Sequence, residues 1–153
     1  MKGSGHDPDR LSRIVEDYKF FLSVRVHYAD TDAQQVVYYG AYSNFYEAAR
    51  QEYWRRMGIK LQEVHQRGNY LSIVEFVNRY YAPAFYDDLL DVYVRTPEIR
   101  PRSFDLDYLV VRRRDSETVA AARTVFVFVN HDDWKAVPIP DWFRTAVEQF
   151  EAR

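Results

Sequence analysis

The pattern of apolar and polar positions along the chain predicts one strand followed by a long helix. Residues 20–28 alternate between the two kinds, which is typical of a strand with one buried face. From 42 to 57 the apolar positions recur at steps of three and four, which predicts an amphipathic helix. Gly58 follows at the point where such a helix takes a left-handed residue after its last turn.

The rest of the chain predicts four further strands, at about 70–81, 88–96, 103–113 and 118–130. The connections between them are short, so we expect an antiparallel meander. A last helix is predicted at 141–151, after two prolines. A sheet and a long helix must each cover an apolar face, so the order of elements predicts an α+β domain in which a curved antiparallel sheet wraps around the helix.

Length and composition suit a single domain with a substantial core. The chain has 153 residues, of which 47% are apolar and 17% are aromatic. Its first ten residues are polar and contain Gly and Pro, so we expect residues 1–17 to form a flexible N-terminal tail and 18–153 to form the domain.

Charge and residue usage exclude several classes of function. The formal net charge is -2, which gives no sign of a nucleic-acid partner. Cys is absent, which excludes disulfides, thiolate metal sites and a cysteine nucleophile. No long apolar run predicts a membrane span or a signal peptide, so we expect a cytoplasmic protein. The basic run 112–114 precedes two acids, Asp115 and Glu117, and is interpreted as a solvated hairpin end.

Two acids, Asp30 and Asp32, lie between the first strand and the long helix. Capping of the helix would explain them and is worth about 0.5–2 kcal/mol. The same position also suits chemistry, because a helix N-terminus presents free backbone N–H groups that can polarise a carbonyl oxygen. A carboxylate beside such donors can attack a carbonyl carbon or activate a water. Both interpretations are open at this point.

No other catalytic motif is found in the sequence. It contains no G-x-S-x-G, H-E-x-x-H, G-x-G-x-x-G or phosphate-binding loop, and its four His are scattered, so we expect no metal and no cofactor. Glu47 is a third acid, on the predicted helix. A helix-face pair with Arg50 or Gln51 is its favoured interpretation, and a second acid in the site is the alternative.

Three stretches resemble a known family. They are V-R-V-H-Y-A-D-T-D-A-Q-Q-V-V-Y-Y at 24–39, F-Y-E-A-A-R at 45–50 and R-Y-Y-A-P-A-F-Y-D-D-L-L at 79–90. Together they resemble the 4-hydroxybenzoyl-CoA thioesterase-like branch of the hotdog-fold acyl-CoA thioesterases, over roughly residues 20–135. The resemblance implies a hotdog fold, hydrolysis of an acyl-CoA substrate, and a homo-oligomer: a dimer whose sheets join, often within a homotetramer, with active sites at the subunit interface.

The resemblance also implies roles for individual residues. The family's catalytic carboxylate corresponds to Asp32, as general base or nucleophile, and its carbonyl-polarising backbone N–H corresponds to Tyr39. Asp30 is expected to shape the turn. The family usually has Gly where this chain has Gln35, and often His where it has Tyr39. Gln35 is expected to offer its amide to the substrate or to a water. Tyr38 and Tyr39 are expected at the pocket edge, where they hydrogen-bond, stack or simply pack.

Coenzyme A carries phosphates, so basic residues are expected to meet it. Arg100, Arg102 and Ser103 precede a strand in a region that can lie near the nucleotide in the family, and an ordinary exposed turn is the alternative. Two other functions remain open. One is an acyl-CoA-binding or regulatory module without catalysis. The other is a dehydratase acting on 3-hydroxyacyl thioesters, which is disfavoured because no His follows Asp32 in the loop.

Overall fold

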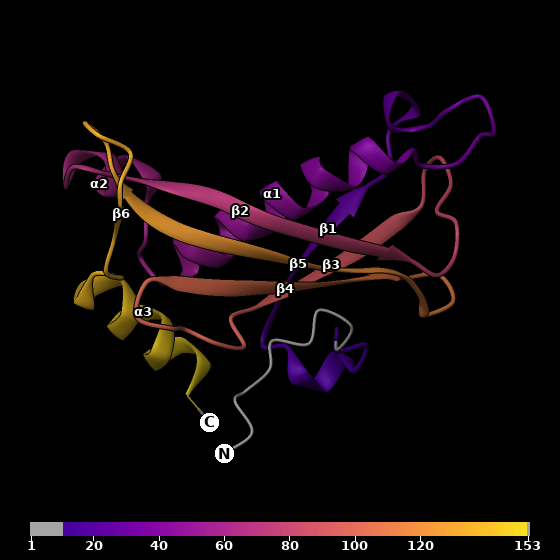
Figure 1. The fold of residues 1–153 in the computed structure, drawn as a ribbon. Helices are drawn as coiled ribbons and strands as arrows, with labels where there is room; N and C mark the ends of the chain where they lie inside the picture. Colours follow the sequence, from indigo (N-terminus) through magenta and orange to yellow (C-terminus); the bar gives the residue numbers. More distant parts are fainter. Residues whose placement is uncertain (1–10, 153) are drawn as a thin grey trace, which may run out of the picture.

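The fold is one curved antiparallel sheet with a long helix along one face (Figure 1). A computed structural model describes residues 11–152. The strands are β1 (Phe20–Arg25), β2 (Asn69–Tyr80), β3 (Leu89–Arg95), β4 (Ser103–Arg112), β5 (Glu117–Asn130) and β6 (Ala136–Val137). The helices are α1 (Tyr39–Arg56), α2 (Leu61–Gln66) and α3 (Asp141–Glu151), with 3₁₀ turns at Val15–Asp17 and Tyr28–Asp30. No helix among the described residues has the length and apolar character needed to cross a membrane.

The order of the strands differs from the expected four-stranded meander. The sheet has the order β1-β3-β4-β5-β2, with the short β6 also paired to β5. Strands β3, β4 and β5 do form a meander, but β2 pairs with β5 and not with β3. The reason lies in the connection 81–88, which is bonded to the junction before α1: the Val26 N–H donates to Asp88 and the Val37 N–H donates to Ala84, each at 2.9 Å. A connection held there cannot also close a hairpin.

Helix α1 packs its apolar stripe on the inner face of the sheet. Its buried residues repeat the predicted stripe, and they are Ala41, Tyr42, Phe45, Tyr46, Ala49, Tyr53 and Trp54. Aromatic rings dominate the contact: Tyr46 lies 4.7 Å from Tyr108 and Trp54 lies 5.7 Å from Phe126, centroid to centroid. Each fully buried side chain of this size contributes about 1.5–3 kcal/mol.

The predicted start of α1 was three residues late, and its predicted end is confirmed. The helix begins at Tyr39, three residues before the predicted start at 42; Tyr39 is exposed, and Ala41 is the first residue of the helix that is buried in the core. At the other end the prediction is confirmed, because Gly58 has a positive φ of 78°. The Gly58 N–H donates to Arg55 and the Ile59 N–H donates to Trp54, both at 2.9 Å, which is the pattern of a Schellman motif.

The described part of the expected tail is not detached from the domain. Residues 1–10 lie outside the described residues, but residues 11–17 pack on the outer face of the sheet. Leu11 and Tyr18 form a buried cluster with Leu109, Val111 and Ala121. The domain boundary expected at residue 17 stays a prediction; what the structure adds is that Leu11 and Val15 of this segment pack in the outer cluster.

Candidate active site

A tight turn between Thr31 and Val37 positions Asp32 ahead of α1. The Asp32 N–H donates to Val36 and the Gln35 N–H donates to the Asp32 carbonyl, each at 2.9 Å. Gln35 has a φ of 67°, in the left-handed region that favours Gly. The chain therefore uses Gln at a position whose backbone geometry explains the Gly that is usual in the family.

The two acids of the turn have different environments. Asp30 accepts a hydrogen bond from the His27 N–H at 2.8 Å, as expected of a residue that shapes the turn. Asp32 is exposed, and its carboxylate accepts a hydrogen bond from the Gln34 N–H, also at 2.8 Å; no cation in the described part of the chain forms an ion pair with it. Neither acid caps α1, since the N-cap is Tyr38. Capping therefore does not explain Asp32.

Asp32 lines an open cleft of about 290 Å³ at the start of α1. Tyr38 and Tyr39 line the same cleft, and Tyr39 is the first residue of the helix, with a backbone N–H that no residue of the helix can accept. The other lining residues are Gln34, Val36, Val37, Tyr42, Tyr80, Ala82 and Pro83. A carboxylate, free amide donors and apolar walls thus share one cleft.

Two phenols of this cleft remain uncharged at neutral pH. Burial, with a further contribution from Tyr80, raises the pKa of Tyr42 to about 12. Burial also raises the pKa of Tyr80 above its ordinary value. The two rings lie 5.2 Å apart in an edge arrangement. Both groups can therefore donate a hydrogen bond to a ligand without adding charge near Asp32.

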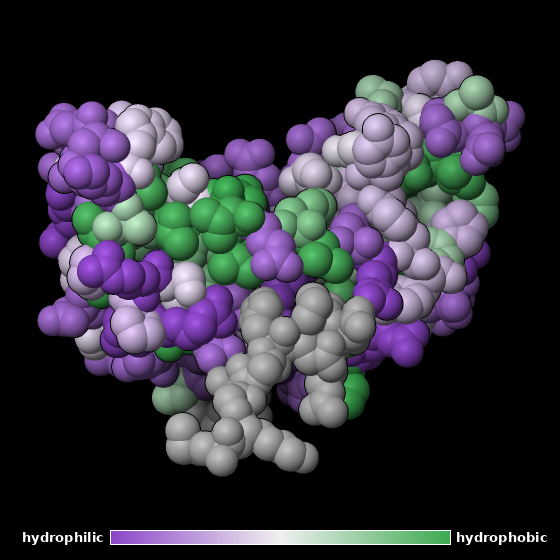
Figure 2. Space-filling model, in the orientation of Figure 1, coloured by the Kyte–Doolittle hydropathy of each residue, from purple (hydrophilic) through white to green (hydrophobic). Residues whose placement is uncertain are grey.

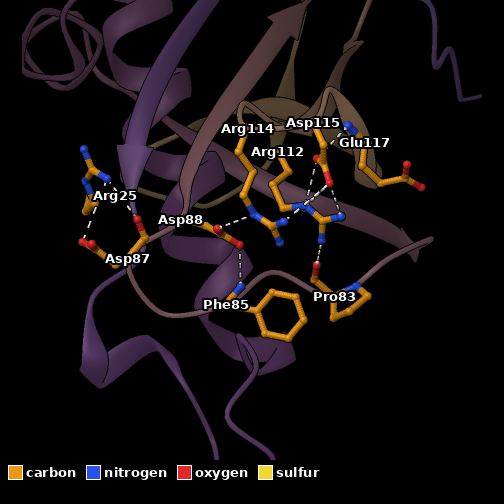
Figure 3. A network of polar contacts seen from close by, with 9 residues as sticks. All are labelled: Arg25, Pro83, Phe85, Asp87, Asp88, Arg112, Arg114, Asp115 and Glu117. Carbon is orange, nitrogen blue, oxygen red and sulfur yellow. Dashed lines mark hydrogen bonds and ion pairs between the residues drawn. The ribbon is translucent and has the colours of Figure 1, made fainter.

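An ion network fixes the wall of the cleft opposite α1 (Figure 3). The Arg112 guanidinium donates to the Pro83 carbonyl at 2.5 Å and holds Asp115 at 2.8 Å. Asp88 accepts from Arg114 and from the Phe85 N–H, both at 2.9 Å. The interpretation of this basic run as a solvated hairpin end was wrong for Arg112, whose side chain is only 10% exposed because it reaches across to the cleft wall.

The other predicted site residues do not share this cleft within one chain. Glu47 accepts from Gln51 at 3.3 Å, as the helix-pair interpretation predicted, and it lines a separate cavity of about 250 Å³ at the middle of α1. Arg100 is bound by Asp105 at 2.6 Å, and Ser103 accepts from Arg100. Arg102 donates to the Ala136 carbonyl at 3.2 Å. These last three lie where β4 begins, beside β6.

Some lining residues were missed in the sequence. Gln34 lines the cleft and Gln35 does not, because the turn directs neighbouring residues differently. Tyr80, Ala82 and Pro83 come from a distant stretch. Their one signal in the sequence was the family block at 79–90. No group of His, Asp or Glu able to hold a metal ion is found within residues 11–152.

Comparison with known proteins identifies the family. Residues 26–147 match the model of the thioesterase-like superfamily. A putative esterase of Aquifex aeolicus is 30% identical over 121 residues, 79% of this chain and 91% of that protein. The acyl-CoA thioester hydrolase YbgC of Escherichia coli is 33% identical over 97 residues, 63% of this chain and 72% of that protein.

The solved structures agree with the fold. The crystal structure of a 1,4-dihydroxy-2-naphthoyl-CoA thioesterase from Synechocystis matches with a TM-score of 0.81, covering 88% of this chain and 98% of that one at 24% identity. The hotdog fold that the resemblance implied is thereby confirmed. The chain belongs to the thioesterase-like superfamily.

Proposed function

We propose that this protein hydrolyses acyl-CoA thioesters to the free acid and coenzyme A. The observation that carries the proposal is the environment of Asp32: an exposed carboxylate without a cationic partner among residues 11–152, in one cleft with the first turn of α1. Relatives named as acyl-CoA thioester hydrolases support the choice of substrate class.

The reaction follows from the groups in the cleft. The carbonyl oxygen of the thioester accepts a hydrogen bond from the Tyr39 N–H, and the partial positive charge at the start of α1 favours the developing oxyanion. Asp32 either removes a proton from the attacking water or attacks the carbonyl carbon itself. In the first route the carbon–sulfur bond breaks and the proton that Asp32 took from the water passes to the leaving thiolate of coenzyme A. In the second route the carbon–sulfur bond breaks to leave an anhydride of Asp32, and a water then hydrolyses this anhydride to the free acid and supplies the proton of the thiol.

Two copies of the chain are proposed to join through β2. Strand β5 pairs with one edge of β2, and no strand of the described residues pairs with the other. Ile73, Val74 and Phe76 are exposed on it at 51%, 58% and 44%, and Figure 2 shows hydrophobic surface gathered on this side of the molecule. An unpaired edge with apolar side chains is a template for a second chain. The dimer is the unit from which the expected homotetramer would be built, in the cytoplasm where acyl-CoA is used.

Release of thiol from a panel of acyl-CoAs, with short, long and aromatic acyl groups, tests the function. The Asp32→Asn variant keeps the size of the side chain and its bond from the Gln34 N–H. Since a positioned base contributes a factor of about 10² to 10⁴, kcat/KM should fall by that much. Asp30→Asn is the matched control, with an expected change in kcat/KM below about tenfold.

Two outcomes would reject the catalytic assignment. If Asp32→Asn keeps the parent's activity while Asp30→Asn loses it, the wrong acid has been assigned. If the parent binds a member of the panel and hydrolyses none, the protein is a binding module, and the strained Gln35 turn gains importance as a sign of lost catalysis.

A further inference from the structure

A second cleft lies at the opposite end of α1 from Asp32. It has a volume of about 530 Å³ and is formed where α1 ends and α2 begins. Its polar lining residues are Gln51, Arg55, Lys60, Gln62 and His65. We call it the Lys60 cleft.

The Lys60 cleft has the charge of an anion site. Arg55 forms an ion pair with Glu52 on the preceding turn of α1, so its charge is already matched. Lys60 is exposed, and no carboxylate of the described residues forms an ion pair with it. His65 contacts the Tyr70 ring edge-on at 5.0 Å and has no acidic partner in the described part. An ammonium, an imidazole and two side-chain amides therefore line a cleft to which the described residues contribute no carboxylate.

The Lys60 cleft belongs to a row of cavities along the side of α1 that faces β2. The Asp32 cleft contains Tyr42 and Tyr80, and the middle cavity contains Tyr46 and Phe76. The Lys60 cleft completes the row. Within one chain its distance from the Asp32 cleft is large, since Tyr39 and Arg55 lie about 24 Å apart at 1.5 Å per residue. The Glu47 carboxylate lies on the path between them, and it would repel a phosphate.

Pairing of two chains through β2 changes this distance. A two-fold axis across a shared strand edge makes the two strands antiparallel. The Asp32 cleft lies at the Tyr80 end of β2, and the Lys60 cleft lies at the Tyr70 end; Figure 1 shows α2 and the turn before α1 at opposite ends of β2. In such a dimer the Lys60 cleft of one chain therefore lies beside the Asp32 cleft of the other.

We propose that the Lys60 cleft binds the phosphate groups of the coenzyme A whose thioester is hydrolysed at Asp32 of the partner copy. The inference rests on the proposed function. In this arrangement each active site depends on both chains. One chain supplies the carboxylate and the amide donors, and the other supplies the cation that binds the phosphates of coenzyme A. Lys60 is thus a substrate-binding residue and takes no part in the chemistry.

Substrates with and without the nucleotide test the role of Lys60. In Lys60→Gln the KM for an acyl-CoA should rise about tenfold at unchanged kcat, which corresponds to about 1.4 kcal/mol. The same acyl group on pantetheine, which lacks the phosphates, should be hydrolysed with the parent's constants. Lys60→Arg should restore the KM for the acyl-CoA, and Lys135→Gln, at an exposed lysine outside the cleft, should leave it unchanged. An acyl-phosphopantetheine distinguishes the phosphate of the arm from those of the nucleotide.

Mixed dimers test the arrangement between chains. A dimer of one Asp32→Asn chain and one Lys60→Gln chain should contain one intact site, with the parent's KM and half its kcat. If the KM stays raised, cation and carboxylate belong to the same chain and the proposed arrangement is wrong. Equal effects of Lys60→Gln on both substrates, or none on either, would also reject it.

The outcome can be separated from failure of the proposed function. If the parent hydrolyses no thioester, the catalytic proposal fails. Calorimetry with coenzyme A alone then decides the binding role: tenfold weaker binding by Lys60→Gln supports the cleft, and equal binding by both proteins overturns it.

Discussion

Acidic side chains occur in two contrasting settings in this molecule. Asp32 lies in an exposed turn and is held by one backbone N–H. Asp107 lies on the outer face of the sheet, fully buried, between Arg123 at 2.6 Å and Arg95 at 3.2 Å. Asp107 is neutralised by guanidinium groups and supports the structure. Asp32 has no such partner within the part of the chain that the structure describes, so its charge is available to a substrate. The partners of an acid, more than its burial, separate the two roles.

Removal of Asp107 should produce the largest effect on stability. Asp107→Asn removes the carboxylate shared by Arg123, which is buried, and Arg95, whose side chain is 15% exposed, and breaking a buried pair of this kind costs about 3–5 kcal/mol. Urea unfolding should show the loss. Asp32→Asn is the matched comparison and should change the free energy of unfolding by less than about 1 kcal/mol, because it removes no ion pair.

Thioesterase activity distinguishes the Asp107→Asn and Asp32→Asn variants in the opposite order. Under conditions where both variants are folded, Asp107→Asn should keep the parent's kcat, and Asp32→Asn should lose it. An Asp107→Asn protein that is folded but inactive would contradict the division into structural and catalytic acids. An Asp32→Asn protein that unfolds as readily as Asp107→Asn would also contradict this division, because it would give Asp32 a structural role.

A smaller effect is expected at Gln35, where the turn stores strain. A non-Gly residue in the left-handed region costs about 1–2 kcal/mol, partly offset in Gly by its greater freedom in the unfolded chain. Gln35→Gly should therefore raise the free energy of unfolding by about 1 kcal/mol. Gln34→Gly is the matched control: its φ is not positive, so the same change should lower stability. If both variants are destabilised, the turn is not strained at Gln35.

Local signals in the sequence predicted the elements well. The steps of three and four in 42–57 identified α1, and Gly58 identified its end, because helix periodicity and a left-handed C-terminal residue are properties of neighbouring positions. The place of β2 was not predictable in this way. It depends on hydrogen bonds between the 81–88 connection and residues Val26 and Val37, which are distant in the sequence.

The residues of the candidate site also divide into those with a local signal in the sequence and those that depend on distant contacts. Asp30 and Asp32 could be selected because they lie beside the predicted start of a helix, which is a local feature, and the family resemblance then pointed to Asp32. The wall formed by Ala82 and Pro83, held by Arg112, required contacts across about thirty residues of sequence. Arg100 was selected as a ligand contact because its partner could not be seen in the neighbouring sequence. In the structure Asp105 forms an ion pair with it.

The smallest expected effect concerns Asp115, an acid that combines features of both settings. It is 40% exposed, like a solvated residue, yet it is held by Arg112. The hydrogen bond from Arg112 holds the pKa of Asp115 below its ordinary value. A lowered pKa in the folded state means that the pair stabilises the protein above the ordinary pKa of an Asp, about 4, and that this contribution is lost as the pH falls through the lowered value.

Titration of the Asp115 carboxyl by NMR should show its pKa moving up in Arg112→Gln and staying low in Arg113→Gln, since Arg113 pairs with Asp91 instead. Because solvent screens an exposed pair, the accompanying change in stability should be much smaller than at Asp107. An Asp115 that titrates in the parent as it does in Arg112→Gln would show that the network at the cleft wall does not depend on this charge.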